Sequence, residues 1–280
     1  MNRKIIFLDV DGTLYSPVIG GTPKSALEAI ELAKKAGHKV LLCTGRSLAG
    51  ATKYLHFPVD GFIFGTGASV YVDGKHIYDN PLSKTQLKTL MKQVEDLDIP
   101  YILEAAAGIY GDKVGYDYIV NYYGGNTADE EKRLKVIRDN NIYHFDYLDE
   151  NESIYKLCIF LRNLDQMKDL EEKIEEPFVL TLSAFEPNHQ LYIVEITNGL
   201  ETKATGIQKV MDYFGLGKED AIGIGDSAND IPMLDYCGLA IAMGNGAEEA
   251  KEHADFITRD ILDDGIYYAF QHFHLMEEMK

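Results

Sequence analysis

The sequence has few cysteines, and their arrangement excludes the common structural roles of this residue. Cys43, Cys158 and Cys237 are too widely spaced for a zinc-binding pattern, and an odd number does not fit a disulfide framework. We therefore expect reduced thiols that lie mostly in the core of a cytoplasmic protein. The eight histidines likewise show no spacing typical of metal ligands.

Basic residues are also scarce relative to acidic ones. The chain contains 27 Lys and Arg against 45 Asp and Glu, so its formal net charge is −18. This balance argues against a nucleic-acid partner and against an anionic membrane surface. An anionic small molecule could still bind, but only with local help from a metal ion, a lysine or a helix N-terminus.

Long apolar runs and repeats are missing as well. No apolar run reaches the roughly 18 residues of a membrane-spanning helix, and the run in the N-terminal "MNRKIIFLDVDG" is too short for a signal peptide. We therefore expect no membrane partner. No fixed-period repeat or low-complexity tract appears.

Strand and helix patterns alternate at both ends of the 280-residue chain. The segments "IIFLDVD", "PKSALEAIELAKKAG" and "HKVLLCTG" predict a strand, a helix and a second strand. This order is typical of a parallel sheet with right-handed crossovers. "DG" at 73–74 predicts a hairpin turn.

The middle of the chain has a different pattern. Adjacent strand patterns with short connections predict an antiparallel sheet with helices on one face. We predict that residues 82–190 form a second, inserted domain, and that 1–81 and 191–280 form the first.

Two aspartates end the first apolar strand and raise a chemical question. Asp9 and Asp11 alternate with Val10, so both carboxylates point the same way along an extended backbone. Their mutual repulsion is tolerable if a cation lies between them or if they share a proton. Gly12 follows and permits a sharp turn or a close approach to a ligand.

Polar groups follow three further predicted elements of the outer segments. Thr44, Gly45 and Arg46 follow an apolar strand, Lys203 starts a helix, and Asp226 and Asp230 lie in the loop "GDSAND". Ligands of open parallel sheets bind at the carboxyl ends of the strands. These segments are therefore the candidate site.

Together, "DVDGT", Thr44, Lys203 and "GDSAND" resemble the four motifs of the haloacid dehalogenase (HAD) superfamily, in this order and with this spacing. The position of the insert, between the second and third motifs, resembles the class IIB, Cof-like phosphatases. The resemblance implies an α/β fold: a Rossmann-like, doubly wound parallel sheet with an inserted α+β cap domain that selects the substrate.

The resemblance also implies a magnesium-dependent phosphatase that works through an aspartyl-phosphate. Asp9 would be the nucleophile and Asp11 the acid and base, while Thr44 and Lys203 would complete the catalytic group. Its Mg²⁺ would be held by Asp9, the backbone carbonyl of Asp11 and Asp226, with Asp230 at the metal site or behind it. The candidate substrate-binding residues are Gly12, Gly45, Arg46 and Asn229.

The sequence leaves several alternatives open. Asp11 argues against a dehalogenase, and the lack of transmembrane patterns argues against a P-type ATPase. A sugar phosphomutase needs the same residues, and a phosphate-ligand sensor would share the fold without turnover. Sugar phosphates, then flavin or pyridoxal phosphates, are the candidate substrates, and a monomer or weak homodimer is expected.

Two positions depart from many Cof-like chains. Thr66 stands where many carry Asn, and Ala204 follows Lys203 where many have Gly. Neither change removes a reacting group. The first bears on loop contacts, and the second on how closely backbone can approach the start of the helix.

Overall fold

The computed structural model describes residues 3–186 and 190–277, and within them the chain divides into two compact units. Among the residues so described, no helix is both long and apolar enough to cross a membrane. The first unit comprises Met1–Gly45, His56–Asp79 and Glu201–Lys280, and the second comprises Arg46–Leu55 and Asn80–Leu200.

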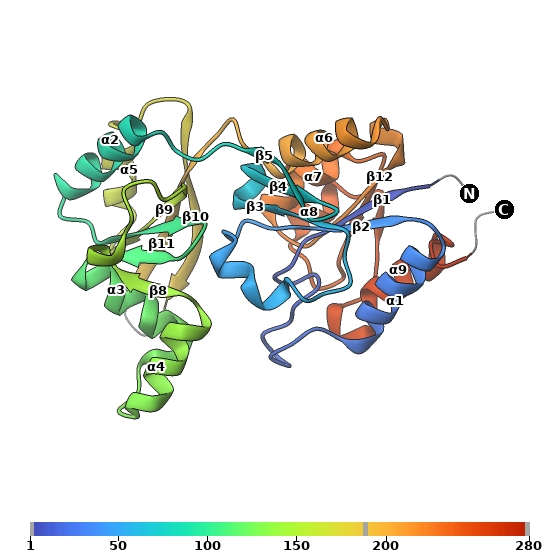
Figure 1. Cartoon of the computed structure of the whole chain (residues 1–280), viewed down its shortest axis with the longest axis horizontal. Coiled ribbons are helices and arrows are strands. Elements are labelled where there is room, and N and C mark those ends of the chain that lie inside the picture. The colour runs from blue at the N-terminus through green and yellow to red at the C-terminus, as the bar shows by residue number, and fades with distance from the viewer. Residues whose placement is uncertain (1–2, 187–189, 278–280) are drawn as a thin grey trace. The chain divides into compact units, whose positions relative to one another are not determined.

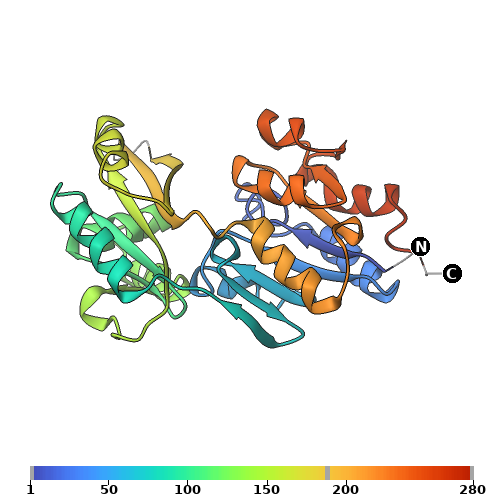
Figure 2. The same ribbon diagram turned by 90° about the horizontal axis from the view of Figure 1, so that it is seen from above.

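The first unit is built on an eight-stranded sheet in the order β14-β13-β12-β1-β2-β3-β4-β5. The strands from β14 to β3 are parallel, and β4 and β5 form an antiparallel hairpin at one edge, drawn in teal in Figure 2. Its strands are β1 (Ile5–Leu8), β2 (Lys39–Cys43), β3 (Gly61–Phe64), β4 (Ser69–Val72), β5 (Lys75–Asp79), β12 (Ala221–Gly225), β13 (Leu239–Ala242) and β14 (Phe256–Ile257).

Helices cover both faces of this sheet (Figure 1). On one face, Ile207 of α6 and Met233 of α7 share a buried cluster with Phe7 of β1 and Leu41 of β2. On the other face, α1 contacts both β2 and α9. The helices are α1 (Lys24–Lys35), α6 (Lys203–Phe214), α7 (Ile231–Tyr236), α8 (Glu248–Glu252) and α9 (Gly265–His272).

The α/β fold predicted for the outer segments is confirmed, and its strand order locates the site. From β1 the chain runs outward through β2 and β3, and it returns after the insert to place β12 on the other side of β1. The strand order thus reverses at β1. Side chains that follow β1, β2 and β12 meet at one edge of the sheet, which is where open α/β sheets bind ligands.

The second unit has a six-stranded sheet in the order β10-β11-β9-β6-β7-β8, antiparallel except for the parallel pair β7 and β8. Its strands are β6 (Tyr101–Ala105), β7 (Ile109–Gly111), β8 (Ile142–His144), β9 (Ile154–Leu161), β10 (Phe178–Glu186) and β11 (Leu191–Asn198). Its helices are α2 (Lys84–Glu95), α3 (Lys113–Val120), α4 (Glu130–Asp139) and α5 (Asp165–Glu171).

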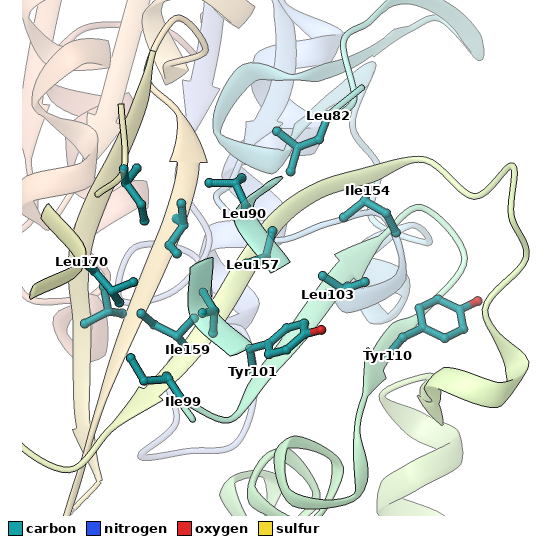
Figure 3. Close-up of a cluster of buried hydrophobic side chains, with 14 of the residues drawn as sticks. Leu82, Leu90, Ile99, Tyr101, Leu103, Tyr110, Ile154, Leu157, Ile159 and Leu170 are labelled. Carbon is teal, nitrogen blue, oxygen red and sulfur yellow. The ribbon is translucent and has the colours of Figure 1, made fainter. Parts of the chain in front are cut away.

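Helices pack on both faces of this second sheet, so the expectation of helices on one face is wrong. Leu90 of α2 and Leu170 of α5 pack with Leu103 and Leu157 in the cluster of Figure 3. Ile119 of α3 packs instead with Ile102 and Phe160, which alternate with the first set along β6 and β9 and so face the other way.

The borders of the second unit also differ from the predicted 82–190. The first unit resumes at Glu201 rather than at residue 191, because β11 pairs with both β10 and β9. The segment Arg46–Leu55, predicted to lie in the first domain, groups with the second unit. Within that unit, the Ser47 backbone N–H donates to Glu104 Oε2 at 3.4 Å, and Asn141 Nδ2 donates to the Ala49 carbonyl at 3.1 Å.

Candidate active site

The centre of the candidate site is a fully buried lysine between two carboxylates. Lys203 Nζ donates to Asp9 Oδ1 at 2.5 Å and to Asp230 Oδ1, and it lies 3.3 Å from Asn229 Oδ1. Asp230 is completely buried and Asp9 is 5% exposed. Thus three of the predicted motifs, which are remote in the sequence, meet at a single ammonium group.

The start of helix α6 fixes where this lysine lies. Thr202 accepts the Thr205 backbone N–H at 3.2 Å, and Thr205 Oγ1 accepts the Thr202 N–H at 2.9 Å. This reciprocal capping makes Lys203 the first residue of the helix. The helix approaches the sheet closely at Gly206, where a Cβ would lie 2.9 Å from Gly67 Cα. Backbone also approaches the helix start closely, since a Cβ on Gly67 would lie 2.1 Å from the Thr202 carbonyl oxygen, and both contacts form with Ala204 in the sequence.

The loop that follows β12 is organised by Asp230. Its Oδ2 accepts the backbone N–H groups of Asp226 at 2.9 Å and Ser227 at 3.0 Å. Its Oδ1 is bound to Lys203, so both carboxylate oxygens are engaged within the protein. These contacts favour a role for Asp230 in positioning the lysine and the loop.

The turn that follows β1 lies directly against Asp226. Gly12 has a φ of +94°, and a Cβ there would lie 2.3 Å from Asp226 Oδ2. Thr13 is fully buried, and its Oγ1 donates to Asp226 Oδ1 at 2.7 Å. Only glycine fits this turn, because any side chain would strike the carboxylate. Asp11 is exposed at the start of the turn.

The pKa values of the site show how its charges compete. Burial raises the pKa of Asp9 well above the ordinary carboxyl value; Asp230 and Asp226 add to this effect and Lys203 opposes it. Burial also raises the pKa of Asp226 to about 6, against the hydrogen bond from Thr13. Burial disfavours the charged form of Lys203, but Asp230 and Asp9 outweigh it and raise its pKa. A further cation would relieve the acidic side of this balance.

The acidic side chains fit a hard divalent cation. Asp9, Asp226 and Asp230 each offer a carboxylate oxygen, and these oxygens lie within 4.8 Å of one another. Oxygen ligands of this kind are those that Mg²⁺ prefers. Because both oxygens of Asp230 are already engaged, Asp9 and Asp226 are the better side-chain candidates for direct ligands.

The second motif lies beside these strands in the sheet. Thr44 follows β2 and is buried, with its N–H donated to the Ile63 carbonyl at 2.9 Å and its carbonyl accepting the Thr66 N–H at 3.1 Å. Gly45 ends this part of the first unit, and Arg46 groups with the second. The predicted contacts of Gly45 and Arg46 with substrate stay predictions.

Sequence reasoning assigned no role to Thr13 or Asn245 and treated Thr66 only as a departure. Thr66 has φ +58°, an uncommon conformation for a β-branched residue, and its Oγ1 lies 3.4 Å from where a Gly45 Cβ would be. Asn245 Nδ2 donates to the Gly12 carbonyl at 2.8 Å. Both Thr66 and Asn245 follow strands of the same parallel sheet, which is the signal that could have identified them.

Comparison with known proteins identifies the family of this chain. The family of haloacid dehalogenase-like hydrolases matches residues 6–270, so the chain belongs to that family. A Bacillus subtilis (strain 168) relative named "Putative phosphatase YkrA" is 29% identical over 279 residues, which cover 99% of this chain and 100% of the relative.

Two further comparisons extend this result. The 5-amino-6-(5-phospho-D-ribitylamino)uracil phosphatase YwtE of the same bacterium is 27% identical over 292 residues, covering 95% of this chain and 96% of YwtE. The solved structure of a HAD subclass IIB sugar phosphatase is 25% identical with a TM-score of 0.74, covering 97% of this chain and 99% of that one. The expected resemblance to subclass IIB and the assignment as a phosphoric monoester hydrolase are confirmed.

Proposed function

We propose that this protein is a magnesium-dependent phosphatase that hydrolyses a small phosphorylated metabolite, with a sugar phosphate as the favoured class. The observation that carries the proposal is the Lys203 ammonium between Asp9 and Asp230, with Asp226 beside them at the carboxyl edge of the sheet. The proposal is supported because phosphoryl transfer requires a nucleophile and fixed positive charge, and the Asp9 carboxylate lies next to the Lys203 ammonium.

The proposed reaction has two steps. An Asp9 carboxylate oxygen attacks phosphorus, the bond between phosphorus and the ester oxygen breaks, and the leaving alkoxide takes a proton from Asp11. Water then attacks the aspartyl-phosphate and gives a proton to Asp11, and the bond to Asp9 breaks to release phosphate. The exposure of Asp11 suits this role, because its carboxyl must reach both the leaving group and the water.

The cation belongs with the residues at the strand ends. Asp9, Asp226 and the Asp11 backbone carbonyl would hold Mg²⁺, with Asp230 behind them. When bound, the ion supplies charge neutralisation between the carboxylate nucleophile and the phosphate. Lys203 provides a further positive charge next to Asp9.

The remaining predicted residues are proposed to bind the phosphate group. Thr44, with backbone N–H groups near Gly12 and Gly45, offers donors at the ends of β1 and β2. Asn229 lies beside Lys203, and Arg46 would add a guanidinium. We assign the choice of leaving group to the second unit, the cap. Phosphate esters of polyhydroxy compounds are favoured, because relatives include a ribitylaminouracil phosphatase and a solved sugar phosphatase.

The test is phosphate release from a panel of sugar, flavin and pyridoxal phosphates, with Mg²⁺ and with excess chelator. We expect Mg²⁺-dependent release from one or a few members. Asp9→Asn, which keeps the shape of the side chain, should lower the rate by at least about 10³-fold with the fold intact by circular dichroism. Sugar-phosphate isomers formed without free phosphate would instead indicate the mutase, and wild-type turnover by Asp9→Asn would overturn the proposed nucleophile.

A further inference from the structure

The loop after β13 packs along the motif loop of β12. The Met243 N–H donates to the Gly225 carbonyl at 2.9 Å, and the Ala247 N–H donates to the Asp226 carbonyl at 2.8 Å. A Cβ on Gly246 would lie 2.9 Å from the Asp226 carbonyl oxygen, so the two backbones touch here. Asn245 is therefore carried on a loop whose position relative to Asp226 is fixed by backbone contacts.

The side-chain amide of Asn245 joins two further segments. Its Nδ2 donates to the Gly12 carbonyl at 2.8 Å, and its Oδ1 accepts the Ile261 N–H at 2.8 Å. Both bonds have ordinary hydrogen-bond length, and both join Asn245 to backbone groups. Although Asn245 is exposed, its amide orientation is fixed, because a flipped amide would face the Gly12 carbonyl with an acceptor and the Ile261 N–H with a donor.

Both backbone polar groups of Gly12 are thereby held by hydrogen bonds. Its N–H donates to the Tyr15 carbonyl at 2.9 Å, and its carbonyl accepts from Asn245. Gly12 has positive φ and no side chain, so without these bonds its backbone could rotate more easily than that of any other residue. Asp11 immediately precedes this peptide, and Thr13, which binds Asp226, immediately follows it.

We propose that Asn245 is a positioning residue that holds the Asp11 side chain where it can transfer a proton to the leaving group. This inference rests on the proposed function, in which Asp11 is the acid. Asn245 acts through the Gly12 carbonyl and touches no reacting atom. A displacement of about 1 Å in a reacting group can cost about 10²-fold in rate, so a single lost bond at this turn is sufficient.

The neutral amide is also the form that this position requires. Asp9, Asp11 and Asp226 already gather negative charge here, and Asp260 lies next to Ile261 in the chain. A carboxylate at 245 could still accept the Ile261 N–H, but it could not donate to the Gly12 carbonyl and would repel it. Asn245→Asp therefore breaks one bond while keeping the shape and the other bond.

The experiment compares two substrates that differ in their need for an acid. The phenolate of p-nitrophenyl phosphate leaves without a proton, whereas the alkoxide of an alkyl phosphate such as glycerol phosphate needs one from Asp11. We measure kcat/KM, which covers events up to release of the leaving group, for wild type, Asn245→Ala and Asn245→Asp. For the alkyl ester we expect a loss of about 10- to 100-fold, and for the aryl ester a loss of less than about threefold.

Two reference variants make the result decisive. Asp11→Asn should show the same preference for the aryl ester with a larger loss, and Asn151→Ala, which removes an exposed amide of the second unit, should match wild type. Equal losses for both esters in both Asn245 variants, or no loss, would overturn the inference while Asp11→Asn still discriminates. If Asp11→Asn does not discriminate, the proposed acid itself is wrong. The isosteric Asn245→Asp keeps the test valid if Asn245→Ala unfolds.

Discussion

Each unit of this protein buries a lysine between two carboxylates, yet only one of the two clusters has the features of an active site. In the first unit Lys203 binds Asp9 and Asp230. In the second, Lys156 Nζ lies 2.7 Å from Glu195 Oε1 and 3.3 Å from Glu104 Oε1, and Lys156 is 4% exposed. Local composition alone therefore does not distinguish them.

The difference lies in where the backbone places the charges. Lys156, Glu104 and Glu195 stand within three neighbouring strands of one sheet, where backbone N–H groups are committed to strand pairing. Lys203 starts a helix, and Asp9 and Asp226 follow the ends of parallel strands, where turns can offer N–H groups and carbonyls to a ligand. The position at strand ends, more than the buried ion pairs, marks the site.

The second cluster also shows why proximity of acids does not suffice for a metal site. Glu104, Cys158 and Glu195 have potential ligand atoms within 4.8 Å of one another. The Lys156 ammonium already bonds both carboxylates and so supplies the positive charge that an ion would bring. Burial, Glu104 and Glu195 all act on the pKa of Lys156: burial lowers it, and the two carboxylates raise it well above its usual range.

Replacing each lysine by methionine tests most directly whether the two clusters have different roles. Lys203→Met leaves the buried Asp9 and Asp230 uncompensated, so it should lower the free energy of unfolding by about 3–5 kcal/mol. Lys156→Met should cost less, because Glu104 and Glu195 are only partly buried and keep some contact with water. Turnover of p-nitrophenyl phosphate per folded molecule should fall by about 10²–10³-fold in Lys203→Met, through loss of positive charge at Asp9. Lys156→Met should stay within about threefold of wild type on this small substrate, because no proposed reacting group contacts it.

Urea unfolding and phosphate release, normalised to the folded fraction, check both parts. The control is the triple change Glu104→Gln, Lys156→Met and Glu195→Gln. It also removes the two carboxylate charges that Lys156→Met leaves unpaired, so it should recover part of the stability that the single change loses. Equal loss of turnover in the two single variants would mean that the clusters have equivalent roles.

A smaller effect on stability is expected from backbone strain, which in the first unit lies next to the candidate site. Thr66 has φ +58°, and among the described residues of the second unit the positive φ values at non-glycine residues belong to Asp98, Asn141 and Gln190. A β-branched residue tolerates this region less well than these do. Thr66→Asn should therefore raise the free energy of unfolding by about 1 kcal/mol. Thermal unfolding measures this gain in stability. The control is Thr44→Ser, a nearby conservative change that should not raise the stability. A Thr66→Asn variant less stable than wild type would show that the Thr66 side chain stabilises the loop.

The smallest effect is a pH dependence that comes from neither lysine cluster. His38 is 3% exposed, and its Nδ1 accepts the Lys4 N–H at 3.0 Å. Its buried Nε2 has no hydrogen-bond partner among the residues that the structure describes. Burial, helped by the charge of Lys4, lowers the pKa of His38 from 6.5. The unfolded chain then binds the proton more readily, so this group's contribution to stability is full above pH 6.5 and declines below it.

Urea midpoints at pH 7.5 and 5.5 test this, with His38→Gln as the variant and His56→Gln as the control at another histidine of the first unit. The fall in midpoint between the two pH values should be smaller in His38→Gln than in wild type and unchanged in His56→Gln. The same fall in all three proteins would contradict the assignment to His38.

Much of the first unit could be predicted because its signals are local. Apolar runs such as Ile5–Leu8 are buried on both faces, and the Asp73–Gly74 turn has the positive φ values that a tight hairpin favours. The grouping of Lys203 with Asp9 and Asp230 followed from the motifs and from the rule that parallel strands end at one edge. The second unit was less predictable, because strands in antiparallel sheets can pair in several orders and their helices can cover either face.

The sequence by itself determined which residues are the candidates for the chemistry, since a strand, a turn and a helix start are short-range features that depend on a few adjacent residues. Only the tertiary structure decided that β11 belongs to the second sheet, that Arg46–Leu55 groups with the second unit, and that Asn245 holds the Gly12 carbonyl. The last pair is 233 residues apart in the chain, and a hydrogen bond across such a distance leaves no periodic or local pattern. It exists because the fold brings two loops together at one edge of a parallel sheet.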